Sequence, residues 1–450
     1  MEVKREFCEA MEELLGAREA EQLVSAIVGS EPVTSVRLNG GKPLDGGLAF
    51  ELGARVPWCD LGYYLDSRAQ FTFDPLFHAG AYYVQDASSM FISHVLRELV
   101  DRPVRYLDLC AAPGGKTTAA IDALPPGSLV VANEVVPSRA RVLADNVMKW
   151  GSPDTVVTQS QPREIGKLRS YFNVVAADVP CSGEGMMRKD SEAASQWSRG
   201  LVAECASRQR EILAAIWPSL KAGGLLIYST CTYNTAENED IVAWLQSEYG
   251  AEAVAVPTAA EWGISGALKG TAPCYRFMPH KTRGEGLTMA VLRKPGAPEP
   301  AVNVKHKPSK ASIPSAVKTW VRGNYEYAEH NGSLVALPSE NAGDMSMLMS
   351  SLHCLTAGIE LCTMKGMKPV PSHALALSRA LCPSSFATVA VDYESAIAYL
   401  RGSAITLAPT PRGYMMLSYG GKPLGFVNNL GTRANNMYPK ALRILSQRSV

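Results

Sequence analysis

Two cysteines in short polar motifs are the residues of this chain best suited to chemistry. Cys181 lies in DVPCSGEG at residues 178–185, and Cys231 lies in YSTCTYN at residues 228–234. Each motif follows an apolar, strand-like run, so in a parallel sheet both thiols would lie at the same edge, above one cleft. A lone cysteine at a strand end is more often a small buried hydrophobe, but two with polar turn chemistry favour a nucleophilic site.

A glycine turn in YLDLCAAPGGKTT at residues 106–118 predicts a strand, a tight turn and a helix that begins at a ligand. Gly114 and Gly115 let a ligand approach the backbone. A phosphate-binding P-loop would need glycine where Cys110 stands, and no G-x-G-x-x-G is present. Glu134, at the end of the next strand, has the offset of a ribose-binding acid. A nucleoside without a pyrophosphate, such as S-adenosylmethionine, fits both facts; a tight turn with an incidental acid is the alternative.

Thiols and a methyl donor together suit one reaction on a pyrimidine. The C5 of cytosine is a poor nucleophile until a thiolate adds to C6, after which C5 can take a sulfonium methyl group and lose its proton. This needs a reactive cysteine, a group near N3 and a nearby methyl donor. Asp178 closes a strand at the ligand-binding edge, where a carboxylate could hold a base edge or a cationic ligand group.

The elements that must position these residues alternate between strand and helix. We expect strands at 105–109, 128–133, 155–159, 172–178, 224–229 and 287–293, with helices at 117–124, 138–150, 201–220 and 235–249. Such alternation predicts an α/β fold with a doubly wound parallel sheet.

The flanking segments have a different pattern. Residues 1–75 predict a small α/β module with an amphipathic helix at 7–24 and a strand at 33–38. A proline-rich stretch at 294–308 predicts a linker. Short strands separated by glycine turns after residue 371 predict a small barrel. This last part carries eight Lys and Arg against two acids, which suits phosphate contact or simply a soluble surface.

Composition sets the outer bounds. With 450 residues the chain should hold two to four domains, and its net charge of +1 identifies no partner. The ten cysteines include no CxxC pair, so we expect no disulfide scaffold, no metal site and a reducing cytoplasm. The charged start has no apolar segment behind it, and no run approaches the roughly 18 apolar residues of a membrane span. We expect a soluble, unexported protein with no membrane contact.

Together, DLCAAPGGKT, DVPCSGEG and STCTYN resemble the Nol/Nop/Sun family of RNA cytosine-5 methyltransferases. SVRLN at 35–39, YVQDASS at 83–89 and RFMPH at 276–280 support the resemblance, and the tail is similar to the C-terminal PUA-like module of bacterial RsmF-type enzymes. It implies a Rossmann-like class I methyltransferase with a doubly wound seven-stranded sheet. The implied domains are an RNA-binding module at 1–75, the catalytic domain at 76–296, a linker and intermediate module at 297–370, and a PUA-like β-barrel for RNA at 371–450.

The resemblance also implies roles. Cys231 would be the nucleophile and Cys181 would assist release of the methylated RNA, although Pro180-Cys181 alone invites the reverse assignment, as in DNA cytosine methyltransferases. Asp178 would contact cytosine and cofactor, and Lys116 would position the base. S-adenosylmethionine would be bound by Cys110, Ala111, Ala112, Pro113, Gly114, Gly115, Lys116, Glu134 and Asp178, with Gln161 in place of an aspartate that the family often has near adenine.

The substrate follows from access to C6. Because a duplex hides C6, the target must be single-stranded, looped or flipped out. The resemblance favours small-subunit ribosomal RNA, free or within a ribosomal particle, with transfer RNA as the alternative and a monomeric enzyme expected. Two other classes are a non-catalytic RNA-binding assembly factor and a nucleotide hydrolase that binds phosphate at Gly114 and Gly115.

Overall fold

The N-terminal helices differ from the single helix expected at 7–24. The computed structural model describes residues 3–44, 46–297, 313–407 and 411–446 of the chain. Helix α1 (Arg5–Leu15) and helix α2 (Ala17–Gly29) are separated by Gly16, whose φ of 80° lies in the left-handed region. Because L-residues avoid that region, glycine allows the break that the amphipathic pattern alone does not reveal.

A small antiparallel sheet follows these helices. Its order is β2-β3-β1-β4, with β1 at Thr34–Leu38, β2 at Arg55–Val56, β3 at Cys59–Leu65 and β4 at Tyr82–Val84. Helix α3 (Pro75–His78) begins where the Asp74 carboxylate accepts the Leu76 N–H at 2.9 Å, with proline at the first helical position. The expected strand at 33–38 is therefore confirmed as β1, one residue shorter.

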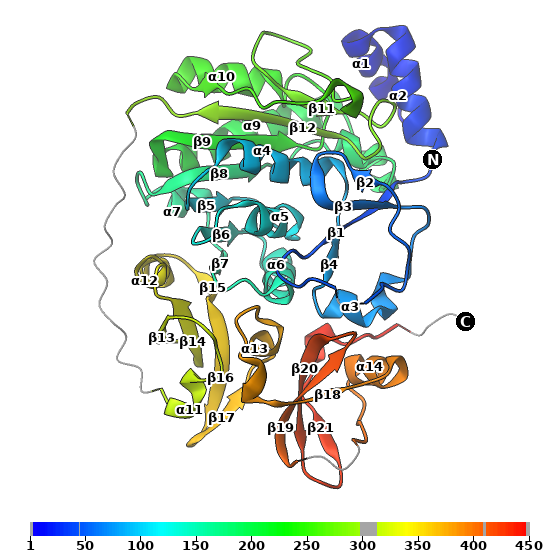
Figure 1. Cartoon of the computed structure of the whole chain (residues 1–450). Helices are drawn as coiled ribbons and strands as arrows, with labels where there is room; N and C mark the ends of the chain where they lie inside the picture. Colours follow the sequence, from blue (N-terminus) through cyan, green and yellow to red (C-terminus); the bar gives the residue numbers. More distant parts are fainter. Residues whose placement is uncertain (1–2, 45, 298–312, 408–410, 447–450) are drawn as a thin grey trace.

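Five parallel strands form the centre of the main sheet, in the order β7-β6-β5-β8-β9 (Figure 1). They are β5 (Arg105–Asp108), β6 (Leu129–Asn133), β7 (Thr155–Thr158), β8 (Phe172–Asp178) and β9 (Leu220–Thr230). In β8 and β9, Asp178 pairs with Ser229. This register places the segments after the two strands side by side.

Antiparallel strands extend the sheet at both edges. Strand β12 (Leu287–Arg293) pairs with β9, and the short strands β10 (Glu252–Ala253) and β11 (Tyr275–Phe277) pair with β12. At the other edge, β15 (Cys354–Ala357) pairs with β7. The described sheet thus has nine strands rather than the expected seven. Strand β15 pairs with the backbone groups that β7 would otherwise leave open at the sheet edge. The sequence did not predict this pairing, because the two strands lie some 200 residues apart and leave no local signal.

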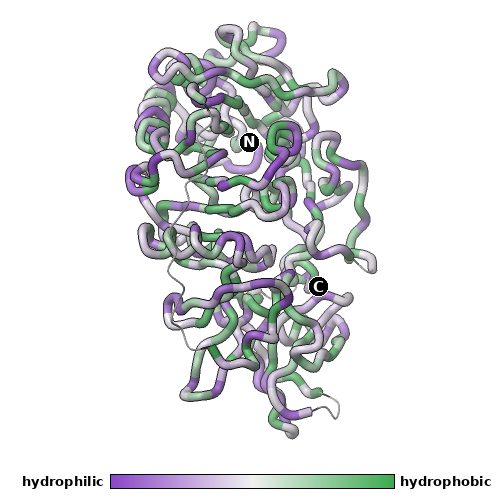
Figure 2. Tube along the Cα trace, turned by 60° about the vertical axis from the view of Figure 1, so that its left-hand side comes forward, coloured by the Kyte–Doolittle hydropathy of each residue, from purple (hydrophilic) through white to green (hydrophobic). Residues whose placement is uncertain are grey.

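Helices cover both faces of this sheet. Tyr106, Val174 and Ile227 pack on the face of α4 (Phe91–Leu99) and α5 (Gly115–Ala123), and α6 (Pro137–Trp150) covers β6 and β7. Strand residues of the other parity pack against α9 (Arg199–Ile216) and α10 (Glu239–Tyr249). In Figure 2, hydrophobic stretches run through the interior and hydrophilic ones recur on outer turns. Among the described residues no helix combines the length and apolarity of a membrane span.

The segment after residue 312 packs against the main sheet. Its sheet, in the order β13-β14-β16-β17, contains β13 (Tyr325–His330), β14 (Ser333–Pro338), β16 (Ile359–Lys365) and β17 (Lys368–Pro371), with α11 (Ser315–Lys318) and α13 (His373–Leu377) beside it. Met345 and Leu348 of α12 (Ala342–Ser351) join the hydrophobic core of the main sheet. Most of the expected linker lies outside the described residues, and the boundaries at 296 and 370 stay predictions.

The C-terminal part is an open sheet rather than the expected barrel. Its strands are β18 (Ala387–Ala390), β19 (Gly413–Tyr419), β20 (Lys422–Asn429) and β21 (Ala434–Asn436), with helix α14 (Tyr393–Leu400) after β18. The order is β18-β19-β20-β21, and no pairing of β18 with β21 closes a barrel in the described part of the chain. Short strands with glycine turns are common to open and closed sheets, so the pattern could not separate them.

Three parts of the chain meet at one buried ion cluster. The Asp122 carboxylate of α5 receives Arg37 Nη1 of β1 at 3.1 Å and Arg379 Nη2, from beyond α13, at 2.7 Å. Arg37 also donates to Thr118 Oγ1 at 2.6 Å in the first turn of α5, and Arg379 Nε donates to Trp150 O at 3.1 Å at the end of α6. The side chains of Arg37 and Asp122 are 1% and 6% exposed, so both charges are largely shielded from water.

Removing Asp122 should destabilise the fold strongly. Asp122→Ala would leave the guanidinium of Arg37 buried without its carboxylate, which typically costs about 3 kcal/mol. We expect a clearly lower urea midpoint than for the wild type, followed by intrinsic fluorescence. The exposed Asp101→Ala is the matched control, and equal midpoints for the two variants would show that the cluster contributes nothing to stability.

Candidate active site

The glycine turn between β5 and α5, the expected ligand cradle, packs closely against helix α6. Gly114 has a φ of 111°, and a Cβ there would lie 3.3 Å from Leu143 Cδ1. Two carbonyls of the turn are held from α6, because Arg139 Nη2 donates to Ala112 O at 2.9 Å and Asn146 Nδ2 donates to Pro113 O at 2.8 Å. The sequence therefore located the turn, but not the α6 residues that fix it.

Glu134 follows β6 and is almost fully buried. Its Oε1 accepts the Val136 N–H at 3.0 Å. Its Oε2 lies 3.3 Å from Arg139 Nη1 but accepts no hydrogen bond from the described residues. A buried carboxylate oxygen with spare acceptor capacity, beside a turn held by the same arginine, fits the hydroxyl donors of a ribose. These residues therefore suit the nucleoside part of S-adenosylmethionine.

Gln161 is the predicted site residue that the structure does not join to the others. It is exposed at the start of α7 (Pro162–Ile165), and its N–H donates to Glu164 Oε2 at 2.7 Å. No hydrogen bond of the described residues links it to Glu134 or the glycine turn. The ends of the neighbouring strands β5, β6 and β7 are instead connected by Asn133, the last residue of β6. Its amide donates to Leu109 O at 3.1 Å, after β5, and to Ser160 O at 3.0 Å, after β7. A buried amide at a strand end was the signal that sequence reasoning missed.

Asp178 and Lys116 form an ion pair at the carboxyl edge of the sheet. Lys116 Nζ lies 2.8 Å from Asp178 Oδ2, and Ser229 Oγ donates to Asp178 Oδ1 at 2.7 Å. Burial lowers the pKa of Lys116, but the Asp178 carboxylate more than offsets this, so the pKa is raised and the ammonium form is favoured. Ser229 follows from the register of β8 with β9 and was not predicted. The pair offers one cation and one anion to a ligand.

The two thiols lie in contact. Cys181 Sγ is 3.1 Å from Cys231 Sγ, and the Cys231 N–H donates to Cys181 Sγ at 3.3 Å. The neighbouring Cys231 sulfur and then burial raise the pKa of Cys181 well above its ordinary value, so its thiol form is favoured. The sequence placed both cysteines at one cleft, and the structure brings them to hydrogen-bond distance.

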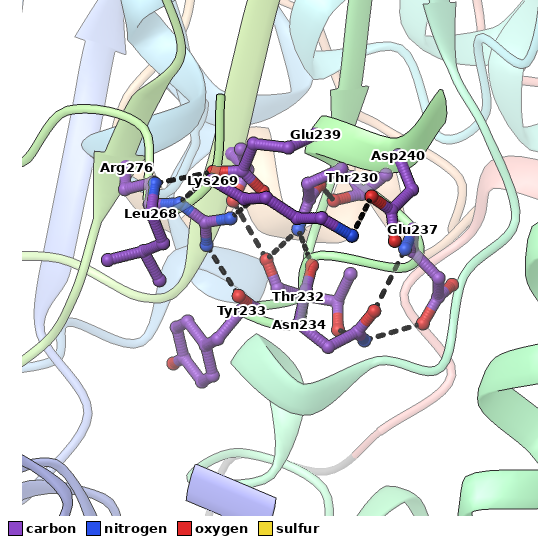
Figure 3. A network of polar contacts seen from close by, with 12 residues as sticks. Thr230, Thr232, Tyr233, Asn234, Glu237, Glu239, Asp240, Leu268, Lys269 and Arg276 are labelled. Atoms are coloured by element: carbon purple, nitrogen blue, oxygen red, sulfur yellow. Dashed lines mark hydrogen bonds and ion pairs between the residues drawn. The ribbon is translucent and has the colours of Figure 1, made fainter. Parts of the chain in front are cut away.

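A buried arginine holds the Cys231 loop from behind. Arg276 of β11, which is 1% exposed, donates to the Tyr233 carbonyl and forms an ion pair with Glu239 of α10 (Figure 3). The RFMPH motif, taken as sequence, assigns no role to this arginine. Its fixed contact two residues beyond Cys231 shows that this motif shapes the loop.

A doubly wound sheet with a glycine turn after its first strand, an acid after its second and thiols at the same edge defines a class, the Rossmann-like methyltransferases. The family model for 16S rRNA methyltransferase RsmB/F matches residues 99–293. Models for the N-terminal domain of 16S rRNA methyltransferase RsmF and for the methyltransferase RsmF PUA domain match residues 3–87 and 386–444. The chain belongs to the family of ribosomal RNA small subunit methyltransferase F.

Two relatives carry that name. The protein of Erwinia tasmaniensis is 31% identical over 411 residues, which cover 86% of this chain and 84% of that protein. The protein of Shewanella piezotolerans is 30% identical over 417 residues, covering 86% and 85%. Both alignments therefore extend well beyond residues 99–293, the segment that the RsmB/F model matches.

Solved structures show the same fold. NSun6 from Pyrococcus horikoshii, crystallised with SFG, is 21% identical with a TM-score of 0.56 and covers 65% of this chain and 99% of that chain. A methyltransferase homologue from Pyrococcus horikoshii is 25% identical with a TM-score of 0.53, covering 64% and 93%. These structures confirm the central α/β fold, and the family models and relatives confirm the methyltransferase assignment. The comparisons do not support a non-catalytic assembly factor or a nucleotide hydrolase.

Asp108 should make stability depend on pH. Burial raises its pKa to about 7, although Thr117 Oγ1 donates to it at 2.7 Å. Between its unfolded pKa and about 7, the folded protein binds a proton that the unfolded chain has lost, so stability falls as the pH rises through this window. Asp108→Asn cannot ionise, and its melting temperature should therefore fall less than that of the wild type between about pH 5 and about pH 8. Asp66→Asn, at an exposed aspartate, is the control. The same change of melting temperature with pH in the wild type and both variants would contradict the assignment.

Proposed function

We propose that this protein transfers a methyl group from S-adenosylmethionine to C5 of a cytosine in small-subunit ribosomal RNA. The observation that carries the proposal is the pair of thiols 3.1 Å apart, beside the ion pair of Asp178 with Lys116 and on the same sheet edge as the glycine turn. The names of the relatives support ribosomal RNA and do not favour transfer RNA.

Cys231 is the proposed nucleophile. Its thiol gives its proton to solvent and the sulfur forms a bond to C6 of the cytosine. The electron pair of the C5–C6 double bond shifts between C4 and C5 as negative charge builds on N3, which makes C5 nucleophilic. Asp178 and Lys116 hold the base edge, where the Lys116 ammonium offsets the negative charge that the ring gains. S-adenosylmethionine supplies the methyl group that C5 takes.

Cys181 is the proposed release partner. Once C5 has lost its proton, the bond between C6 and Cys231 Sγ breaks and the aromatic ring is restored. Cys181 lies against that sulfur, and its thiol form is favoured. A thiol in contact with the leaving sulfur can share a proton with it as that sulfur departs.

The proposed cofactor contacts run along the glycine turn from Cys110 to Lys116, with Glu134 on the ribose and Asp178 near the methyl donor. The held carbonyls of Ala112 and Pro113 and the unfilled Oε2 of Glu134 support this placement. Gln161 remains proposed as an adenine contact from its position after β7 alone.

RNA binding is assigned to the flanking parts. The RNA substrate is supported by the relatives and by the match to a PUA domain at residues 386–444, and the basic surplus after residue 371 suits phosphate contacts. We further propose a monomer that acts on single-stranded or looped RNA, free or within a ribosomal particle. Ten free cysteines suit a reducing cytoplasm.

The two cysteine variants should fail at different steps. Cys231→Ala removes the attacking sulfur and should abolish methyl transfer. Cys181→Ala retains attack but slows release, so a covalent protein–RNA adduct should accumulate on denaturing gels. Cys382→Ala, at a partly exposed cysteine remote in sequence from the motifs, is the control. Methyl transfer by Cys231→Ala would overturn the assignment.

The substrate is tested by bisulfite sequencing of ribosomal and transfer RNA from cells with and without the gene. We expect loss of 5-methylcytosine at one or more positions of small-subunit ribosomal RNA and no change in transfer RNA. Loss confined to transfer RNA, or no loss in either, would contradict the proposal.

A further inference from the structure

A buried carboxylate ties the Cys181 loop to the Cys231 loop. Glu184 lies three residues after Cys181 and is 0% exposed. Its Oε2 accepts the backbone N–H groups of Tyr233 at 2.6 Å and Asn234 at 3.0 Å, both in the Cys231 loop. Its Oε1 accepts Trp197 Nε1 at 2.9 Å and Asn234 Nδ2 at 3.0 Å. One side chain from the first loop thus fixes the backbone of the second.

A second carboxylate makes the reciprocal connection. Glu237 lies six residues after Cys231 and is also 0% exposed, and its Oε2 accepts the Ser182 N–H of the Cys181 loop at 3.0 Å. Gln209 Nε2 donates to the same oxygen at 2.8 Å. Each loop therefore carries a glutamate that accepts backbone N–H groups of the other.

Asn234 joins the two carboxylates. Its Nδ2 donates to Glu237 Oε1 at 2.9 Å as well as to Glu184, and its Oδ1 accepts the Glu237 N–H at 2.9 Å. Figure 3 shows Asn234 and Glu237 facing each other in this network, with Arg276 reaching the Tyr233 carbonyl from the opposite side. The backbone of Tyr233 therefore donates its N–H to the Glu184 carboxylate and accepts a hydrogen bond at its C=O from the Arg276 guanidinium.

Uncharged groups balance both carboxylates. Among the described residues, no lysine, arginine or histidine nitrogen forms an ion pair with Glu184 or Glu237. A buried carboxylate is tolerated only when donors surround it, so its position is dictated by where these N–H groups point. Four N–H groups point at the two carboxylate oxygens of Glu184, and both oxygens can accept them. Glutamine could not replace this arrangement, because its NH₂ group would face N–H donors.

We propose that Glu184 is a positioning residue that sets the separation of the two thiols, with Asn234 and Glu237 completing the clasp. The inference rests on the proposed roles of Cys231 and Cys181. The clasp acts through backbone, since Gly185 N–H also donates to Cys231 O at 2.8 Å. Glu184 does not reach the substrate in this account; it keeps the attacking and the releasing sulfur at the 3.1 Å contact that the reaction uses.

A bifunctional thiol reagent tests the geometry without requiring methyl transfer. Phenylarsine oxide binds two neighbouring thiols: each sulfur bonds to the arsenic, and the two thiol protons leave with its oxygen as water. In the full-length protein, Glu184→Gln should weaken the binding of phenylarsine oxide about 10- to 100-fold, the worth of a lost charge-assisted hydrogen bond. Its kcat for RNA methylation should fall by a similar factor, with the KM for S-adenosylmethionine unchanged.

Controls separate positioning from general loss of structure. Cys181→Ser breaks the pair and gives the background of the nine thiols that remain, Cys231 among them. Glu192→Gln, at an exposed glutamate of α8 (Ser191–Gln196), should match the wild type. Thermal melting shows whether each variant folds. If Glu184→Gln melts at a lower temperature than the wild type, Asn234→Ala is the second variant, since it removes the same link from the Cys231 loop and should weaken arsenical binding equally.

The outcomes distinguish this inference from the proposed function. Wild-type arsenical affinity and kcat in a folded Glu184→Gln, or in Asn234→Ala, would overturn the clasp while leaving the reaction intact. A wild-type protein that binds the arsenical tightly but methylates no RNA would instead overturn the proposed function. Restored arsenical binding in Glu184→Asp, which keeps the charge, would support the carboxylate as the acting group.

Discussion

The pairing of β8 with β9 is the constraint on which the rest of the site depends. Asp178 lies opposite Ser229 in that parallel register, and a cysteine follows each of them within three residues. A slip of one residue would move one loop by about 3.3 Å and turn its side chains to the other face of the sheet. The ion pair with Lys116, the serine contact and the thiol contact all require this one alignment.

Fixed strands alone do not fix loops, and the structure adds two kinds of support. Beneath the thiols, buried glutamates and Arg276 bind loop backbone directly, with side chains that water cannot solvate. Behind the glycine turn, the Asp122 cluster connects helix α5 to β1 and to Arg379 of the C-terminal half. The N-terminal and C-terminal parts are thereby connected to the helix that follows the glycine turn through short, buried contacts, so their placement and that of the turn are not independent.

The accuracy of the sequence predictions varies with the range of the interactions involved. The strands β5 to β9 and helix α6 were predicted to within a few residues, because the apolar runs that mark them are local features of the sequence. The break at Gly16 was missed, since an amphipathic pattern continues across it. Strand β15 and the open C-terminal sheet were missed because pairing partners distant in the chain decide them. Gln161 was placed by analogy of position, and the structure gives it no link to the cradle.

By itself, the sequence determined the chemistry available to this protein: two thiols in polar turns, a carboxylate and a lysine at strand and helix ends, and a turn open to a nucleoside. Residue types and short spacings carry that information because they depend on neighbours in the chain. Only the tertiary structure decided that the thiols touch, that Glu184 and Glu237 hold each other's loops, and that Arg37 and Arg379 share Asp122. These contacts join segments tens to hundreds of residues apart, and burial gives them their strength.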